Sequence, residues 1–215
     1  MLTEVAKGKS VGRALFHSAL RRWPGQLDGL VLDLACKRQP DYRRLLGLDS
    51  NPRVWLVGVD YERRFRPTVV ADLTKSLPFR DAVADVAICA NFLNIHPEPT
   101  QLLLEVRRVL KVGGVLLLTA PLVYPYNPEP TDFYRFTEKA LERLLEGTGF
   151  FITDLIPLGD RWTAAEYLLG PFLRPHWLTG LLVIGLCLLL DRATHRFFKR
   201  WPPCPIGYLI RACTV

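Results

Sequence analysis

Residues 31–42 read VLDLACKRQPDY, an apolar run with an aspartate near its end, followed by a polar turn and a helix-forming stretch. In parallel α/β sheets the turn after such a strand holds the ligand, because it lies at the carboxyl edge of the sheet. Ligand-binding turns of this kind normally contain glycine, which adopts positive φ without strain. This turn contains no glycine. The stretch therefore predicts a nucleotide-type site and leaves open how its turn is built.

Apolar runs of strand length alternate with helix-forming stretches along most of the chain. The runs are 29–35, 53–60, 68–72, 84–90, 115–121 and 150–158, and the helix-forming stretches are 40–48, 97–114 and 137–149. Thr137 is placed to cap the third helix, and Gly113 and Gly114 to end the second. Strands that are apolar on both faces need helices on both sides, which right-handed crossovers provide. The expected fold class is α/β, with a doubly wound, mostly parallel sheet.

The composition favours one globular domain with a basic C-terminal part. With 215 residues, of which 49% are hydrophobic, the chain can bury a sizeable core. The net charge of +7 is uneven, since residues 161–215 carry seven Lys or Arg against two Asp or Glu. No basic run interleaved with aromatics precedes residue 161, so nucleic acid is not an expected partner. A membrane surface suits the basic part better.

The cysteines and the first residues indicate a reducing, cytoplasmic setting. The five cysteines form no C-x-x-C pair and no histidine follows at ligand spacing, so neither a metal site nor a disulfide framework is expected. Residues 1–27 lack the uninterrupted apolar run of a secretory signal, and their apolar residues are spaced as in an amphipathic helix. We expect this helix to stay in the protein.

Polar residues stand at the ends of four successive predicted strands. They are Asp33, Asp60, Asp72 and Asn91. Each alone could equally form a turn or cap a helix. Because the carboxyl ends of parallel strands meet at one edge of a sheet, the four together favour a ligand site at that edge.

Five motifs in a fixed order carry a resemblance to a known family. They are VLDLAC, GVDYE, VVADLTKSLPFRDAVADVAICANFLN, LLEVRRVLKVGGVLLLTAP and DFYRFTEKALERLLEGTGF. The chain resembles the class I S-adenosylmethionine-dependent methyltransferases, especially the type 11 branch, over residues 28–157. The resemblance implies a Rossmann-like methyltransferase fold with seven strands in the order 3-2-1-4-5-7-6, the last strand antiparallel. Residues 206–215 would form that strand, and residues 158–205 a helical, apolar and basic insertion before it.

The resemblance also implies S-adenosylmethionine as the cofactor and gives roles to the strand-end residues. Asp60 would accept both ribose hydroxyls, a task that suits a carboxylate. Tyr61 would stack on the adenine, and Asp72, with the amide of Leu73, would bind the adenine edge. Asp33 would orient the amino end of the cofactor.

The turn after the first strand departs from the family pattern. The family has glycine at the positions of Ala35, Lys37 and Gln39. Cys36 lies between the first two of these positions. A non-glycine residue with positive φ costs on the order of 1 kcal/mol. Two hypotheses follow. The chain is a methyltransferase in which Ala35, Cys36 and Asn91 face the cofactor, or it is a non-catalytic module that binds a membrane surface or a protein partner.

The loops after the fourth and fifth strands hold the candidate catalytic residues. The family often has an acid followed by histidine where this chain has NIH at 94–96. His96 could act as a general base, and the alternative is an ordinary solvated histidine. Tyr134 lies in a stretch that resembles the branch's substrate-side loop, and the alternative is a lid held by Asp132 and Arg135. Because methyl transfer needs mainly a well-placed acceptor, the acceptor stays open between a small molecule and a lipid-like one.

The insertion contains an apolar run with aromatic and basic flanks. Residues 178–190 are apolar for thirteen residues, short of the roughly twenty that span a bilayer. The flanking aromatic residues are Trp177, Phe197, Phe198 and Trp201, and the flanking basic residues are Arg192, Arg196, Lys199 and Arg200. Such flanks are typical of interfacial segments. We expect residues 176–201 to rest on the cytoplasmic face of a membrane. The alternative is a helix buried over the sheet or between copies of the chain in a homo-oligomer.

Overall fold

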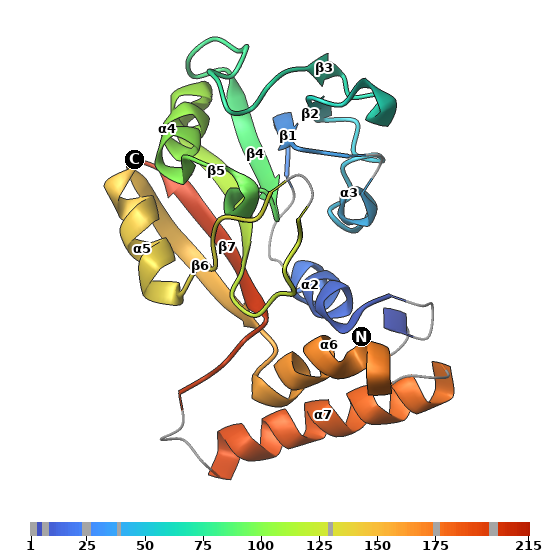
Figure 1. Cartoon of the computed structure of the whole chain (residues 1–215). Helices are drawn as coiled ribbons and strands as arrows, with labels where there is room; N and C mark the ends of the chain where they lie inside the picture. The colour runs from blue at the N-terminus through green and yellow to red at the C-terminus, as the bar shows by residue number, and fades with distance from the viewer. Residues whose placement is uncertain are drawn as a thin grey trace.

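The computed structural model describes residues 4–5, 9–22, 27–37, 40–128, 131–173, 177–197 and 202–215. Within these ranges a seven-stranded sheet lies between helices on both faces (Figure 1). The strands are β1 (Gly29–Leu34), β2 (Val54–Asp60), β3 (Val69–Val70), β4 (Ala84–Ala90), β5 (Leu110–Pro121), β6 (Phe150–Leu158) and β7 (Gly207–Thr214). The α-helices are α2 (Val11–Arg21), α3 (Asp41–Leu45), α4 (Pro99–Val109), α5 (Glu138–Gly147), α6 (Arg161–Leu173) and α7 (Trp177–Phe197), and the 3-10 helices are η1 (Arg63–Phe65) and η2 (Leu93–Ile95).

The strands lie in the order β3-β2-β1-β4-β5-β7-β6. β7 is antiparallel to both of its neighbours, and the other adjacent pairs are parallel. This is the order that the resemblance implies, and the C-terminal strand lies where it was expected. The order reverses between β1 and β4, so the carboxyl ends of β1, β2 and β4 border the crevice in which ligands bind in such sheets.

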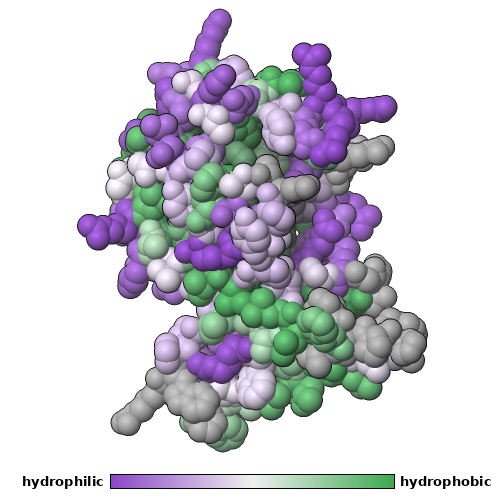
Figure 2. Space-filling model, in the orientation of Figure 1, coloured by the Kyte–Doolittle hydropathy of each residue, from purple (hydrophilic) through white to green (hydrophobic). Residues whose placement is uncertain are grey.

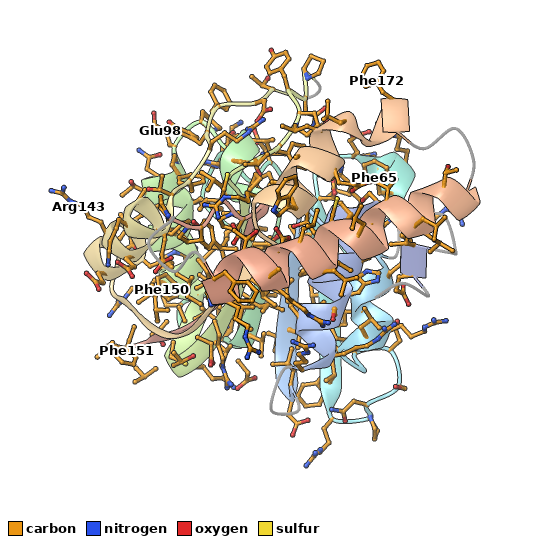
Figure 3. All side chains as sticks on the ribbon, turned by 90° about the horizontal axis from the view of Figure 1, so that it is seen from below. Phe65, Glu98, Arg143, Phe150, Phe151 and Phe172 are labelled. Atoms are coloured by element: carbon orange, nitrogen blue, oxygen red, sulfur yellow. The ribbon has the colours of Figure 1, made fainter. Side chains whose placement is uncertain are left out.

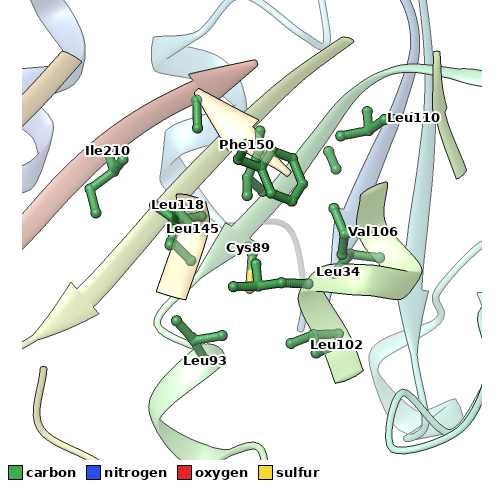
Figure 4. Packing of buried hydrophobic residues seen from close by; sticks show 14 of the residues in the cluster. Leu34, Cys89, Leu93, Leu102, Val106, Leu110, Leu118, Leu145, Phe150 and Ile210 are labelled. Atoms are coloured by element: carbon green, nitrogen blue, oxygen red, sulfur yellow. The ribbon is translucent and has the colours of Figure 1, made fainter. Parts of the chain in front are cut away.

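Two apolar clusters, one on each face, hold the helices to the sheet. On one face, Leu116 and Leu118 of β5 are buried beneath α4 and α5 (Figure 4). On the other face, Leu117 is buried with Leu20 of α2 and Tyr42 of α3. Because side chains alternate along a strand, one apolar run supplies both clusters. The alternation confirms the doubly wound fold.

The second predicted helix is shorter in the structure than in the sequence-based prediction. α4 ends at Val109, and β5 begins with the next residue. The carbonyls of residues 108–109 accept hydrogen bonds from the amides of residues 82–83, which draws the chain alongside β4 at that point. The prediction that Gly113 and Gly114 end the helix is therefore wrong, because tertiary pairing ends it earlier.

The segment between β6 and β7 forms two helices that pack on each other below the sheet (Figure 1). Ile184 of α7 is fully buried in a third apolar cluster with Val11 and Ala14 of α2 and Ala164 of α6. Among the helices of the described ranges, none is long and apolar enough to cross a membrane. The insertion is thus joined to the rest of the fold through the N-terminal helix.

Asp191 of α7 fixes the beginning of α6. Its Oδ1 accepts from the amide of Trp162 at 2.8 Å. Its Oδ2 accepts from the amide and the hydroxyl of Thr163, at 3.2 and 2.8 Å, and from the amide of Asp160 at 3.2 Å. The first amides of a helix have no partner within the helix, and a carboxylate satisfies them well. One side chain of α7 therefore caps α6 and holds the pair together.

Candidate active site

The four polar strand-end residues lie at the same edge of the sheet. Asp33 lies in β1 one residue before its end, Asp60 ends β2, and Asn91 directly follows β4. Asp72 follows β3, which pairs with β2 through Asp60 and Val70. Since β1 to β4 are all parallel to their neighbours, their carboxyl ends meet as the sequence predicts.

The turn after β1 has the backbone shape of a glycine turn without its glycines. Ala35 has a φ of 53° and Lys37 a φ of 47°, both in the left-handed region. The amide of Cys36 donates to the carbonyl of Val59 at 3.2 Å, and the amide of Lys37 donates to Oδ2 of Asp60 at 3.0 Å. These bonds to β2 offset the cost of positive φ, which is about 1–2 kcal/mol per residue. The third position of the pattern, Gln39, lies outside the described residues.

Asp60 joins the turn to the loop after β2. Its carboxylate is buried, with Oδ1 accepting from the amide of Glu62 at 3.0 Å and Oδ2 from the amide of Lys37. A carboxylate oxygen accepts a second hydrogen bond, so both oxygens keep capacity for ribose hydroxyls. The ring of Tyr61 is exposed beside it, and its hydroxyl donates to Glu62 at 3.1 Å. This arrangement fits the adenosine end of S-adenosylmethionine.

Asp72 is exposed and organises its own loop. One oxygen accepts from the amide and the hydroxyl of Thr74, at 3.0 and 2.7 Å, and these hydrogen bonds lower the pKa of Asp72. The next residue, Leu73, is buried, and its carbonyl accepts from Nε2 of His96 at 2.9 Å. The second oxygen of Asp72 faces Lys75 at 3.8 Å, which leaves it open to an adenine amino group.

Asp33 is placed as predicted but is already bound by its own chain. The side chain is 0% exposed. Its Oδ1 accepts from the hydroxyl of Tyr42 and its Oδ2 from Nε of Arg43, both at 2.7 Å. Burial raises the pKa of Asp33, and the guanidinium of Arg43 together with the Tyr42 hydroxyl opposes that rise. The carboxylate therefore has an internal counter-ion.

A cavity of about 370 Å³, hereafter the main pocket, opens next to the turn. The residues that line it include Phe16 and His17 of α2, Lys37 of the turn, Asn91, Thr119 of β5, Tyr124, Tyr167 of α6 and Tyr208 of β7. Asn91 and Thr119 fix each other there, since the amide of Asn91 donates to the Thr119 hydroxyl at 2.8 Å and that hydroxyl donates back to Oδ1 at 3.1 Å. The volume and the aromatic walls suit a small organic acceptor.

The two candidate catalytic side chains are held by backbone groups. Nδ1 of His96 accepts from the amide of Glu98 at 3.1 Å while Nε2 donates to the carbonyl of Leu73, so both ring nitrogens are used. The hydroxyl of Tyr134 donates to the carbonyl of Pro97 at 2.9 Å. Neither residue is among those that line the main pocket. In this arrangement both residues position loops.

The loop before α5 is fastened by a charged pair. Both oxygens of Asp132 accept from the guanidinium of Arg135 at 2.5 Å, and this pairing lowers the pKa of Asp132 to about 2. The same guanidinium lies 5.5 Å from the ring centre of Tyr124, whose ring in turn lies 5.9 Å from that of Tyr167. The loop therefore reaches the insertion at the wall of the main pocket.

Three residues of the site escape sequence reasoning. Arg43 leaves no signal because the helix that carries it has only five residues. Tyr124 and Tyr167 belong to segments with no periodic link, and only the folded chain brings their rings together. The proline-rich stretch around Tyr124 was the available hint, since it predicts a stiff loop near the site.

Comparisons with known proteins show what the chain resembles. Residues 25–118 match the model of a family described as a methyltransferase domain. Similar solved structures include the 4+2 cyclase SpnF, which is 23% identical over 94% of this chain and 80% of that one, with a TM-score of 0.57. A comparison with curated proteins found no significant match.

Two further solved structures carry cofactor-linked names. An S-adenosylmethionine-dependent methyltransferase from Mesorhizobium loti is 16% identical over 94% of this chain and 99% of that one, with a TM-score of 0.59. The 1,6-didemethyltoxoflavin-N1-methyltransferase of Burkholderia thailandensis, with S-adenosylhomocysteine bound, is 16% identical over 95% and 78%, with a TM-score of 0.56. At these identities the structural likeness shows the fold.

Proposed function

Because residues 25–118 match a methyltransferase-domain family, we propose that the chain is a class I S-adenosylmethionine-dependent methyltransferase of the type 11 branch and that it methylates an acceptor held in the main pocket. S-adenosylmethionine supplies the activated methyl group. The observation that carries the proposal is the turn after β1, where Ala35 and Lys37 keep positive φ without glycine and Asp60 holds the amide of Lys37. A chain that had lost the cofactor would have no need to keep this strained conformation.

The proposed division of the site follows its geometry. Asp60, Tyr61 and Asp72 bind the adenosine end, where carboxylates and an open ring suit hydroxyls, an amino group and a flat base. The turn at Ala35 and Cys36 supports the middle of the cofactor. Asn91 lies where the turn meets the main pocket, so the methyl group would point toward the acceptor there.

The proposed source of the acceleration of methyl transfer is the positioning of the acceptor. Methyl transfer gains most from a close, in-line acceptor, and the main pocket provides a walled space for one. Its aromatic side chains offer apolar contacts to a hydrophobic or lipid-like acceptor. The same lining also contains charged residues, namely Arg13, Lys37 and Asp41. The lid with Asp132 and Arg135 and the ring of Tyr167 would exclude water from the reacting groups.

The first prediction concerns Asp60. Replacing Asp60 with alanine is expected to weaken the binding of S-adenosylhomocysteine about 10–100-fold, because hydrogen bonds to a charged group contribute about 1.5–3 kcal/mol. Isothermal titration calorimetry measures this directly. The matched control is Asp154→Ala, which removes a carboxylate from β6 at the opposite edge of the sheet. If the folded wild-type protein releases no heat at high concentration, the proposed cofactor site is wrong.

We also propose that α7 rests on an anionic membrane surface at the cytoplasmic face. Leu182, Leu186 and Leu189 are 75%, 56% and 62% exposed and lie on one side of α7 through their helical spacing. Figure 3, seen from below, places α7 across the face nearest the viewer, and Figure 2 shows apolar residues gathered over the lower part of the molecule. Arg192 and Arg196 are exposed toward the end of the same helix. The predicted interfacial segment also includes Phe198, Lys199, Arg200 and Trp201, which lie outside the described residues.

The second prediction tests this surface by flotation with vesicles. The wild-type protein is expected to float with vesicles rich in phosphatidylserine and to lose binding as salt rises, because each basic residue near an anionic surface contributes about 1 kcal/mol. Replacing Leu182, Leu186 and Leu189 together with asparagine is expected to abolish flotation. A control with asparagine at three other exposed apolar positions uses Trp55, Val112 and Phe151. If the leucine variant instead dissociates a dimer and flotation is unchanged, α7 belongs to an interface between copies.

A further inference from the structure

The Asp33 and Arg43 side chains form an ion pair in the interior of the protein. Nε of Arg43 lies 2.7 Å from Oδ2 of Asp33, with the Arg43 side chain 14% and the Asp33 side chain 0% exposed. The hydroxyl of Tyr42 donates to the other oxygen at 2.7 Å. Both strong donors come from α3, which directly follows the turn. Each oxygen of Asp33 therefore already has a partner supplied by the protein.

The backbone of β2 is shaped around the same arginine. Gly58 pairs with Asp33 across β1 and β2. A Cβ atom at Gly58 would lie 2.9 Å from Nη2 of Arg43 and 2.9 Å from Sγ of Cys36. Both distances are shorter than normal contacts allow, so the guanidinium lies directly against a strand that has no side chain at that point. The position of Arg43 is thus fixed by packing as well as by charge.

This arrangement changes what Asp33 is able to recognise. A buried carboxylate that already has a guanidinium partner gains little from a second cation, because that cation must be desolvated and must displace the first one. The resemblance implies that Asp33 orients the amino end of the cofactor, but no part of this carboxylate is open to a ligand. Asp60 differs in that the two groups that donate to it are neutral backbone amides, so each of its oxygens still has capacity for a ligand hydroxyl.

We propose that Arg43 takes the place of the cofactor's positively charged amino group as the partner of Asp33. This chain then binds the cofactor without a contact between Asp33 and that amino group. The proposal rests on the proposed function, since it concerns the same cofactor. Its consequence is a site that accepts sulfur-linked adenosine ligands with or without an α-amino group. Arg43 is then a specificity-determining residue for the cofactor.

Calorimetric titration with two ligands tests the proposal. They are S-adenosylhomocysteine and its deaminated analogue, in which hydrogen replaces the α-amino group. The wild-type protein is expected to bind the two with affinities within threefold of each other. In Arg43→Met, the unpaired Asp33 gains the ligand's ammonium as its partner, so the preference for S-adenosylhomocysteine is expected to rise to tenfold or more.

Two further variants keep the test decisive. Arg44→Met removes an exposed arginine from the same helix and is expected to behave as the wild type. The double variant Asp33→Asn with Arg43→Met removes both charges and is expected to bind S-adenosylhomocysteine within threefold of the wild type, which answers the question even if Arg43→Met alone does not fold. A tenfold loss of affinity for S-adenosylhomocysteine in the double variant, or a tenfold preference for S-adenosylhomocysteine over the deaminated analogue in the wild type, overturns this proposal and leaves the cofactor site standing. Absence of binding by every variant overturns the cofactor site together with it.

Discussion

Replacing Arg43 with methionine is expected to lower the free energy of unfolding by about 3–5 kcal/mol, because the change leaves the buried carboxylate of Asp33 without a counter-ion. Methionine keeps much of the volume of the arginine stem, so lost packing contributes less than the unpaired charge. Urea denaturation followed by circular dichroism measures the change. An effect of this size would take a large share of the 5–15 kcal/mol that stabilises a typical domain.

Two companion variants separate charge from packing. Arg44→Met, at an exposed position of the same helix, is expected to change the free energy of unfolding by less than about 0.5 kcal/mol. Adding Asp33→Asn to Arg43→Met removes the orphaned charge and is expected to restore most of the loss. If the double variant is as unstable as Arg43→Met, packing against Gly58 rather than the ion pair would account for the effect.

Replacing Asp191 with alanine is expected to cost about 3 kcal/mol and to loosen α6 from α7. The variant leaves the amides of Trp162 and Thr163 without their acceptor, while the amide of Asp160 and the hydroxyl of Thr163 keep hydrogen bonds to each other's residue, and an unsatisfied buried donor costs about 1–3 kcal/mol. Water reaching the exposed end of the helix recovers part of that cost. Urea denaturation and hydrogen exchange of the α6 amides measure the two effects.

The two oxygens of Asp191 make a graded comparison possible. Asparagine keeps the acceptor for Trp162 at Oδ1 but replaces Oδ2, which serves Asp160 and Thr163, with a donor. We therefore expect Asp191→Asn to lose nearly as much stability as Asp191→Ala. Arg192→Ala, at the exposed neighbouring position, is the control. If Asp191→Ala lowers the free energy of unfolding by less than about 1 kcal/mol, the apolar cluster around Ile184 holds α6 and α7 together without the cap.

The sheet and its polar edge were predictable because their signals are local. Apolar runs between turn residues locate the strands, and Thr137 caps α5 as expected, accepting from the amide of Ala140. The resemblance added the strand order, including the placement of β7 between β5 and β6. The position of Asp60 at the end of β2 followed from the same reasoning.

The interior of the site was not predictable, because it depends on contacts between distant segments. A rule based on glycine predicts strain at Ala35 and Lys37, and it says nothing of the Asp60 carboxylate that stabilises the turn. The partner of Asp33 comes from a five-residue helix without a periodic pattern. Likewise, the apolar run of the insertion indicates the helix α7, whereas the capping of α6 by Asp191 of α7 emerges only from the folded arrangement.

Because Arg43 lies close to the β2 backbone, substitutions at Gly58, Arg43 and Asp33 depend on one another. Because a Cβ atom at Gly58 would lie 2.9 Å from both Nη2 of Arg43 and Sγ of Cys36, a substitution there requires both side chains to move or to become smaller. The arginine, in turn, is lost at low cost only after Asp33 has lost its charge. Drift at these three positions therefore has a preferred order of steps, in which the acid is the first to change and the glycine the last.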